Sequence, residues 1–441
     1  MRPIPFSSII ISRWTASAAI VLPAGWYGKV LHDPFGFAVL NGEKYGAPNR
    51  FFVHWLMSAY FRQVPIWLQA IIGPVSSIYA ACAILKTITQ LVMTGVFAKY
   101  IEAITGYKNI IMAAALVVPL FQTSGYSQQM GLIESSITYA CFYSVPLALL
   151  LVYFLPFLRK DKLHHPAMHV GLAALGIALP LSGPLVPALV LIICPMVFAH
   201  HLFARKPLPR AWAFQLGLIT AWSLWSMYVG TFNVENPSHP MPLVQRYAAL
   251  LAGIGSIGTI KLGLPMLIGA ICFNLFLIKK QAVPSTEGTV FFWAKQALFF
   301  MTAYLLLLPF GGFRIYRPLI VRHDTMVPVT MALVLLYGLS SFYLLHHAAP
   351  AFKRKYIGLL CAISLAFTMA DLPEFWRNAC EKSALETIAV STEKTVALPV
   401  DCPVMSWQTI RDTSESKLNL KLLQHWGLAE NVRSYYTGHG E

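Results

Sequence analysis

The chain has 441 residues, of which 57% are hydrophobic and only 12% are charged. This composition lies far from that of soluble globular proteins and excludes an ordinary soluble domain. The net charge of +15 does not indicate a nucleic-acid partner, because the basic excess lies in residues 1–370, with 26 Lys+Arg against 8 Asp+Glu, while residues 371–441 hold 7 against 10. Short cytoplasmic loops of membrane proteins collect Lys and Arg in this way. We therefore predict an all-α polytopic membrane protein with no nucleic-acid partner.

The first apolar run, at about residues 8–31, carries Arg13 and is not followed by a convincing small-residue cleavage site. It is therefore expected to remain as the first membrane span rather than to be removed as a signal peptide. Ten further apolar runs are candidates for helices that cross a bilayer of roughly 30 Å. The predicted spans number about eleven, at about residues 8–31, 66–98, 108–122, 137–158, 167–181, 184–204, 211–230, 260–279, 290–310, 326–345 and 356–371.

Basic loops alternate along these predicted spans. If the N-terminus lies inside, each alternate loop is basic and lies inside, as expected for cytoplasmic loops. Eleven spans then leave residues 371–441 outside. We therefore predict a multi-pass protein of a bacterial inner membrane, with a cytoplasmic N-terminus and a periplasmic C-terminal segment. The inside loops are at residues 99–108, 159–162, 205–210, 279–280 and 353–355.

Two segments do not fit a simple series of spans. Residues 51–62 place His54, Ser58 and Arg62 at a four-residue spacing among aromatic side chains, which is typical of an amphipathic helix in the membrane interface. Residues 244–258 form a Gly-rich apolar run that begins near Arg246. For this second run the sequence leaves three alternatives open, namely an interfacial helix, a re-entrant segment or part of a longer tilted span.

The composition changes sharply after residue 370. Residues 371–441 are predicted to form a small soluble domain outside the membrane, with a helix at about 414–427 and short extended pieces near 398–403 and 405–407. About seventy residues form a small core, so help from the membrane part or from a crosslink is expected. Cys380 and Cys402 are its only cysteines, and in an oxidising compartment they are expected to form a disulfide.

Residues 1–370 contain only eight acids, so candidates for a catalytic carboxylate can be found by elimination. Asp33 follows the first span directly and starts the loop 32–65, where a carboxylate held at the membrane surface could act as a general base. The alternative is that Asp33 only starts a turn before Pro34. Five acids are predicted on the outer side, namely Asp33, Glu43, Glu134, Glu235 and Asp324.

Glu134 lies at the outer entrance to the fourth predicted span, after the polar run that begins at Gln128. A carboxylate so close to hydrocarbon is costly, and such residues have a partner or a function. The alternatives are a role in a site and an interfacial acid bonded to Ser135, Ser136 or a basic neighbour.

Arginines on the outer side break the positive-inside trend locally. Arg314, Tyr316 and Arg317 are followed closely by Arg322. Arginine forks bind phosphate oxygens in pairs, so this run is a candidate site for a lipid phosphate. The alternatives are contact with anionic headgroups or, for Arg322, a salt bridge to Asp324.

These features together resemble the polytopic glycosyltransferases of the GT-C superfamily. The resemblance rests on Asp33 after the first span, on Asn49-Arg50-Phe51 before an interfacial helix, on Ser136-x-x-Tyr139, on Arg314-x-Tyr316-Arg317 and on an outer C-terminal domain. It implies transfer of a sugar from a polyprenyl-phosphate carrier to an envelope glycan or lipid acceptor, with inversion at the anomeric carbon.

The resemblance also implies roles for single residues. Asp33 would be the general base, and Arg314 and Arg317 would stabilise the leaving lipid phosphate. Many family members carry two adjacent acids in the first loop, whereas His32 precedes Asp33 here. The second acid is therefore Glu43 or Glu134, and the need for a divalent metal stays open. Further substrate-binding candidates are Arg50, His54, Tyr316 and Arg322.

Two other classes of protein compete with an enzyme. One is a transporter or flippase of a lipid-linked or anionic substrate, in which the arginines line a path. The other is a non-catalytic subunit of an envelope assembly complex. Transporters place polar residues deep within several spans, whereas this chain concentrates them at the predicted outer face. That distribution favours the enzyme.

Overall fold

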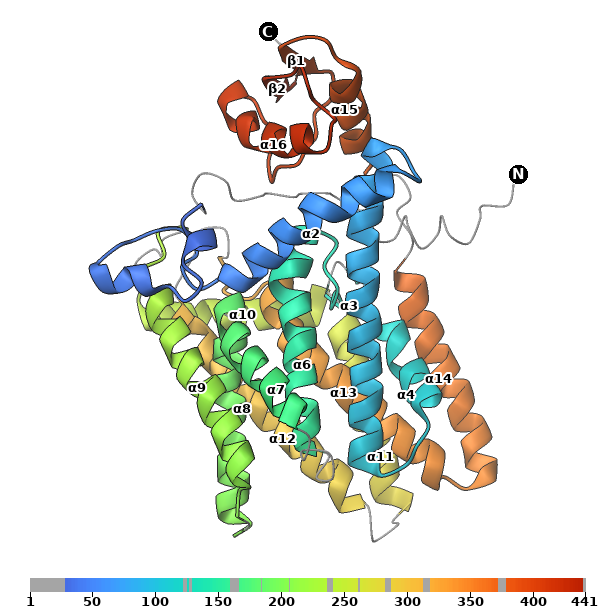
Figure 1. The fold of residues 1–441 in the computed structure, drawn as a ribbon. Coiled ribbons are helices and arrows are strands. Elements are labelled where there is room, and N and C mark those ends of the chain that lie inside the picture. Colours follow the sequence, from blue (N-terminus) through green and yellow to red (C-terminus); the bar gives the residue numbers. More distant parts are fainter. Residues whose placement is uncertain are drawn as a thin grey trace.

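The computed structural model describes residues 28–121, 125–126, 129–158, 166–183, 185–205, 207–235, 241–260, 262–281, 287–311, 318–371 and 378–438. Most of these residues are helical, and the helices stand side by side as a bundle with the C-terminal segment at one end (Figure 1). The helices up to residue 370 are α2 (Phe51–Gln69), α3 (Pro74–Thr105), α4 (Ile110–Val117), α5 (Ile137–Tyr139), α6 (Val145–Leu158), α7 (Pro166–Ala178), α8 (Leu185–Phe203), α9 (Arg210–Gly230), α10 (Leu243–Ile260), α11 (Gly263–Gln281), α12 (Glu287–Leu307), α13 (His323–His347) and α14 (Pro350–Ala370).

The predicted span 66–98 begins within α2 and crosses the break at residues 70–73 before it continues as α3. The later predicted spans overlap the helices from α4 to α14, and the number of about eleven spans stays a prediction. Residues 8–27 of the first predicted span lie outside the described residues, and residues 28–31 lie in a turn and at the start of the 3-10 helix Val30–His32. Six described helices are long and apolar enough to cross a membrane, so the chain is compatible with a multi-pass membrane protein. They are Pro74–Thr105, Ile137–Leu158, Leu185–Phe203, Gly263–Lys280, Gly288–Gly311 and His323–His347.

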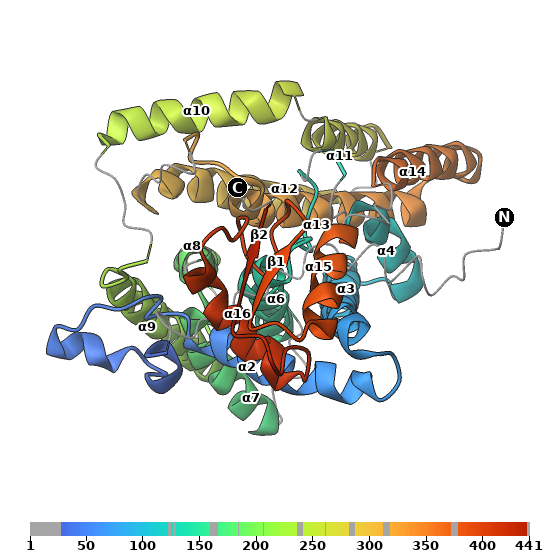
Figure 2. The same ribbon diagram turned by 90° about the horizontal axis from the view of Figure 1, so that it is seen from above.

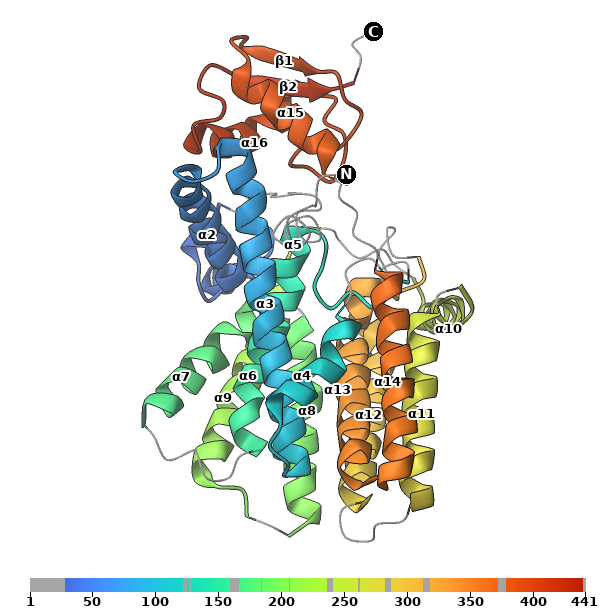
Figure 3. The same cartoon turned by 90° about the vertical axis from the view of Figure 1, so that its right-hand side faces the viewer.

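The two ends of the bundle differ. Helices α3, α8, α11 and α13 end, and helices α4, α9, α12 and α14 begin, at one end of the bundle (Figures 1 and 3). We name it the basic end, because the predicted basic loops at 99–108, 279–280 and 353–355 lie there. The opposite end, named the tail-side end, carries α2, α10 and residues 378–438. The predicted basic loop at 159–162 lies outside the described residues.

Helices α2 and α10 do not run along the bundle. Viewed from above, α10 lies lengthwise across the tail-side end, whereas it is seen end-on from the side (Figures 2 and 3). This orientation favours an interfacial helix over a continued span for residues 244–258. The predicted helix at 51–62 is present as α2 but extends to Gln69, because Pro65 is tolerated within it and apolar residues continue beyond Arg62.

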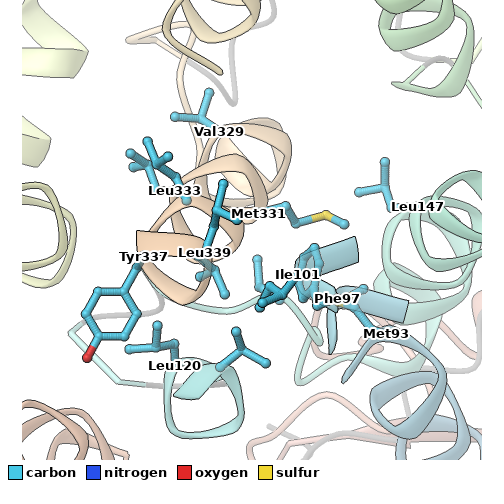
Figure 4. Packing of buried hydrophobic residues seen from close by; sticks show 14 of the residues in the cluster. Met93, Phe97, Ile101, Leu120, Leu147, Val329, Met331, Leu333, Tyr337 and Leu339 are labelled. Atoms are coloured by element: carbon cyan, nitrogen blue, oxygen red, sulfur yellow. The ribbon is translucent and has the colours of Figure 1, made fainter. Parts of the chain in front are cut away.

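Helix α13 is the centre of the apolar core. Met331 and its neighbours pack against Phe97 and Ile101 of α3 (Figure 4). Gly338 permits this close approach, because a Cβ there would lie 2.7 Å from Val117 and 2.8 Å from Ile101. Small residues commonly allow transmembrane helices to approach in this way.

A hydrogen-bonded cluster joins α11, α13 and α14. The Asn274 amide donates to Ser340 Oγ at 3.0 Å and to Ser341 Oγ at 2.9 Å, and Tyr356 donates to Asn274 Oδ1 at 2.7 Å. Polar side chains between apolar helices stabilise packing when they bond to one another. The cluster therefore fixes three helices of the core.

The described C-terminal residues form two helices and a small parallel sheet. The predicted helix at 414–427 is confirmed as α16, and the predicted disulfide between Cys380 and Cys402 is present, with Cα atoms 6.4 Å apart. Extended structure near 398 is confirmed in part, whereas residues 405–407 form no strand. The elements are α15 (Ala379–Val390), β1 (Thr395–Leu398), α16 (Thr413–His425) and β2 (Ser434–Thr437), with β1 paired to β2 in parallel.

The C-terminal segment shares its apolar core with α2 and α3. Trp426 is only 2% exposed, and its indole Nε1 donates to the carbonyl of Phe61 at 2.8 Å. Gln69 donates back to the Trp426 carbonyl at 2.9 Å, and Tyr79 of α3 donates to Glu381 Oε2 at 3.3 Å. Because one hydrophobic cluster includes residues of α2, α3 and the C-terminal segment, the segment is packed onto these helices and also has an internal disulfide.

Candidate functional site

The start of α13 gathers charged side chains at the tail-side end. Arg322 is the N-cap residue, and its backbone is fixed by Thr325, whose hydroxyl accepts from Arg322 N at 2.8 Å. Asp324 is fully buried in the first turn, and its Oδ1 lies 3.5 Å from Arg322 Nε. An acid in the first turn is favoured by the helix dipole. The predicted Arg322–Asp324 salt bridge is therefore present.

Glu134 pairs with an imidazole from the same helix start. Its Oε1 lies 2.8 Å from His323 Nε2, and the two side chains are only 6% and 18% exposed. The loop that carries Glu134 is held by Ser144, which donates to the Leu132 carbonyl at 2.8 Å, and by Lys86 of α3, which donates to the Ser135 carbonyl. A buried carboxylate thus lies beside an imidazole that pairs with it as an ion when protonated.

A pocket of about 140 Å³ is lined in part by His323. It is bounded by α10, by the start of α11 and by residues 319–326, and both Arg322 and His323 line it. Gln129 bridges two of its walls, because its amide donates to the Ile257 carbonyl at 3.2 Å and accepts from Leu264 N at 2.8 Å. Arg322 and His323, the partner of Glu134, thus line a pocket beside helix α10.

A second charged group forms around the start of α2. Arg50 Nη1 lies 3.6 Å from Glu235 Oε2, and its guanidinium lies over the Phe142 ring at 5.8 Å. Burial raises the pKa of Glu235 to about 7. Burial, followed by the charge of Arg50, lowers the pKa of His54 to about 3, so its imidazole is neutral at physiological pH. The structure thus brings together Arg50 and His54, two of the predicted candidates, and places Glu235 beside Arg50.

Asp33 is held by three donors within its own loop. Its Oδ1 accepts from Phe37 N at 2.9 Å, and its Oδ2 accepts from Ala38 N at 2.8 Å and from the Tyr45 hydroxyl at 2.6 Å. Burial, together with the bond to Asp33, raises the pKa of Tyr45, so the phenol stays protonated and donates. These contacts agree with the turn-forming alternative and leave about one acceptor position on the carboxylate.

Glu43 lies apart from the other candidates. It forms an ion pair with Lys29, and the two side chains are 45% and 39% exposed. A solvated pair of this kind contributes little and leaves the charge in water. The described geometry therefore does not bring Glu43 to Glu134 or Arg322.

One short segment connects the two charged groups. Tyr139 precedes the π-helical turn Ala140–Ser144, which carries Phe142, and π turns are frequent at functional sites. Arg322 Nη2 donates to the Tyr139 hydroxyl at 3.4 Å and lies over its ring at 5.7 Å. Tyr139 thus faces the α13 group, while Phe142 faces Arg50 and His54.

The remaining candidates and the residues that sequence analysis missed can now be placed. Arg314, Tyr316 and Arg317 lie in residues 312–317, outside the described residues. His323 and Glu235 were not proposed as site residues. Their signals were present, because His323 stands between Arg322 and Asp324 and because Glu235 is one of the few outer acids. Within the described residues, no group of three or more His, Cys, Asp or Glu side chains is arranged to hold a metal ion.

Comparison with protein-family models gives no match for this chain, and neither does comparison with curated proteins. The fold supports the coarse class of a helical chain compatible with several membrane passages. The chemistry of the site therefore follows from the geometry of the chain's own residues.

Proposed function

We propose that this chain is a membrane glycosyltransferase that moves a sugar from a polyprenyl-phosphate carrier to an envelope glycan or lipid acceptor. The supporting observation is the buried Glu134–His323 pair, which adjoins Arg322 at a pocket beside the interfacial helix α10. A carboxylate, an imidazole and a guanidinium at one interface supply a base and a phosphate-binding cation.

Each of these groups has one role in the proposed sugar transfer. A hydroxyl oxygen of the acceptor attacks the anomeric carbon of the donor and forms the new C–O bond. The bond between that carbon and the phosphate oxygen breaks, and its electron pair leaves with the lipid phosphate. The hydroxyl proton passes to the carboxylate, directly or through His323. Arg322 stabilises the negative charge on the phosphate, and Arg314 and Arg317 are proposed to assist it.

Two carboxylates compete for the role of base. Asp33 is bound by three donors of its own loop, whereas Glu134 contacts an ionisable side chain that lines the pocket. A base must transfer its proton onward, and a neighbouring imidazole provides that route. We therefore assign the base to Glu134 and propose that Asp33 orders its own loop.

The tail-side end is proposed to face the periplasm of a bacterial inner membrane. The disulfide between Cys380 and Cys402 supports this orientation, because disulfides persist in oxidising compartments. The basic loops at the opposite end support it independently. The charged pairs of the site lie at the tail-side end, while the polar cluster around Asn274 is bonded within itself, which favours an enzyme over a transport path.

The test compares carboxylate variants of the purified chain in lipid nanodiscs, with polyprenyl-phosphate sugars as donors and envelope glycans as acceptors. Glu134→Gln is expected to lower the transfer rate by about 10²–10⁴-fold, the range of general-base catalysis. Glu43→Gln is the matched control and is expected to leave the rate unchanged, because that carboxylate lies in an exposed pair.

Asp33→Asn separates the two assignments. A smaller loss than in Glu134→Gln is expected, because the amide still accepts some of the loop hydrogen bonds. Transfer that survives Glu134→Gln but disappears in Asp33→Asn would return the role of base to Asp33. Absence of transfer by the unmodified chain with every donor would contradict the proposed function itself.

A further inference from the structure

Trp407 is a large aromatic side chain that the C-terminal segment leaves at its surface. It is 47% exposed, whereas Trp426 of the same segment is 2% exposed. The Trp407 ring packs against Tyr139 of the membrane part, with ring centroids 4.7 Å apart and planes inclined at 33°. An exposed indole therefore lies directly beside the segment that connects the charged groups of the site.

The loop that carries Trp407 is fixed at several points. Cys402 is bound to Cys380 by the disulfide. Met405 N donates to Oε1 of Glu381, the residue that follows Cys380, at 2.9 Å. Tyr435 donates to the Val404 carbonyl at 3.0 Å. Met405 has a φ of +50°, a conformation that most side chains adopt only at a cost. The position of the exposed indole is thus imposed by the buried contacts of its own loop.

Tyr139 links this indole to the site. Its hydroxyl accepts from Arg322 at 3.4 Å, and the Tyr143 ring lies 5.6 Å away. Arg322 in turn lines the pocket beside α10. An aromatic surface made by two distant parts of the chain therefore adjoins a guanidinium that can bind oxygen atoms.

We propose that Trp407 and Tyr139 form a platform for a sugar ring of the acceptor, which identifies the acceptor as a saccharide. The inference rests on the proposed function. The C–H face of a pyranose or furanose ring is apolar and can cover an indole, while its hydroxyl groups reach polar partners such as the Tyr139 hydroxyl and Arg322. Aromatic side chains with an apolar face and a polar edge suit such a ligand.

Contact with lipid headgroups is the competing role, because Trp and Tyr are enriched at membrane interfaces. Trp55 and Trp67 of α2 fit that role, since they are 55% and 65% exposed on an interfacial helix. Trp407 differs from them because it belongs to the C-terminal segment and stacks on a ring that contacts Arg322. These contacts favour the saccharide.

The test measures binding without catalysis. Isothermal titration of the full chain in nanodiscs would use soluble hexasaccharides of glucose, mannose, N-acetylglucosamine and arabinose as probes. At least one is expected to bind, and Trp407→Ala is expected to weaken it roughly tenfold, the size of one aromatic contact. Trp407→Phe is expected to retain most of the affinity. Trp67→Ala is the matched control and is expected to bind as the unmodified chain does.

The outcomes separate this inference from the proposed function. Binding that depends on Trp407 while no donor sugar is transferred would support the platform and contradict the transferase. Failure of every hexasaccharide to bind, or equal binding by Trp407→Ala, would overturn the platform. A lower melting temperature of Trp407→Ala in nanodiscs with unchanged binding would assign the indole to headgroup contact. If Trp407→Ala does not fold, Tyr139→Leu supplies the same comparison.

Discussion

The two ends of the helix bundle use charge differently. At the basic end, Lys99 pairs with Glu102 within one turn of α3. At the tail-side end, Glu134 reaches His323 on α13, and Arg50 at the start of α2 reaches Glu235 after α9. A local pair forms whenever its helix forms, whereas a long-range pair requires the complete fold. The Glu134–His323 and Arg50–Glu235 pairs therefore depend on tertiary structure.

The largest contrast is expected between two arginines. Arg322→Gln at the tail-side end should lower transfer by about 10²–10³-fold, the cost of removing one donor that stabilises developing charge. Arg354→Gln on α14 should leave the rate unchanged, because that exposed side chain lies at the basic end. Steady-state transfer in nanodiscs measures both. Equal losses in the two variants would show that transfer depends on overall positive charge. They would contradict a specific role for the tail-side end.

The disulfide is expected to have the next largest effect. Cys380→Ser opens a loop with a sequence separation of 22 residues and should lower the free energy of unfolding of the C-terminal segment by about 3 kcal/mol. Limited proteolysis across a urea series measures this change. Cys272→Ser is the matched control, because this exposed cysteine lies on α11 and forms no disulfide. Equal protection of both variants would contradict a stabilising crosslink.

The smallest effect is a pH dependence at Glu235. Burial raises its pKa to about 7 from an ordinary 4.5. Between these values the folded chain keeps a proton that the unfolded chain releases, so stability should fall as pH rises through this window. With a quarter of the side chain exposed, the change is on the order of 1–2 kcal/mol.

Variants of two acids isolate this dependence. Thermal melts of Glu235→Gln between pH 4.5 and 7 should lack the decline that the unmodified chain shows, because the amide does not ionise. Glu102→Gln at the basic end should keep the decline. A decline of the same size in Glu235→Gln would assign the titration to another group.

The sequence predicts the helices better than it predicts which residues contact one another in the fold. The long helices α3, α8 and α13 follow from continuous apolar runs, and α16 follows from its amphipathic pattern. The start of α15 at Ala379 was missed, because its turns mix small, polar and charged residues and its apolar face is defined only by packing on α3 and β1. Local periodicity therefore accounts for most of the fold.

The candidate site shows the limit of this approach. Glu134 was identified because an acid near hydrocarbon is rare, and Arg322 because arginines on the outer side break the positive-inside trend. Their connection through His323 was not, because it depends on how a loop and a helix far apart in the chain meet. The surroundings of Asp33 depend likewise on Tyr45, which no spacing rule connects to it. The scarcity of charged residues identifies candidate site residues, whereas their roles depend on tertiary contacts that the sequence does not show.

The contact between Trp426 and Phe61 also has a consequence for biogenesis. It joins positions 365 residues apart, which corresponds to roughly 20–70 s of synthesis at 5–20 residues per second. During that interval the face of α2 that carries Met57 and Phe61, both fully covered in the finished fold, has been made but its C-terminal cover has not. This face of α2 therefore completes its packing only after the last residues of the chain have been made.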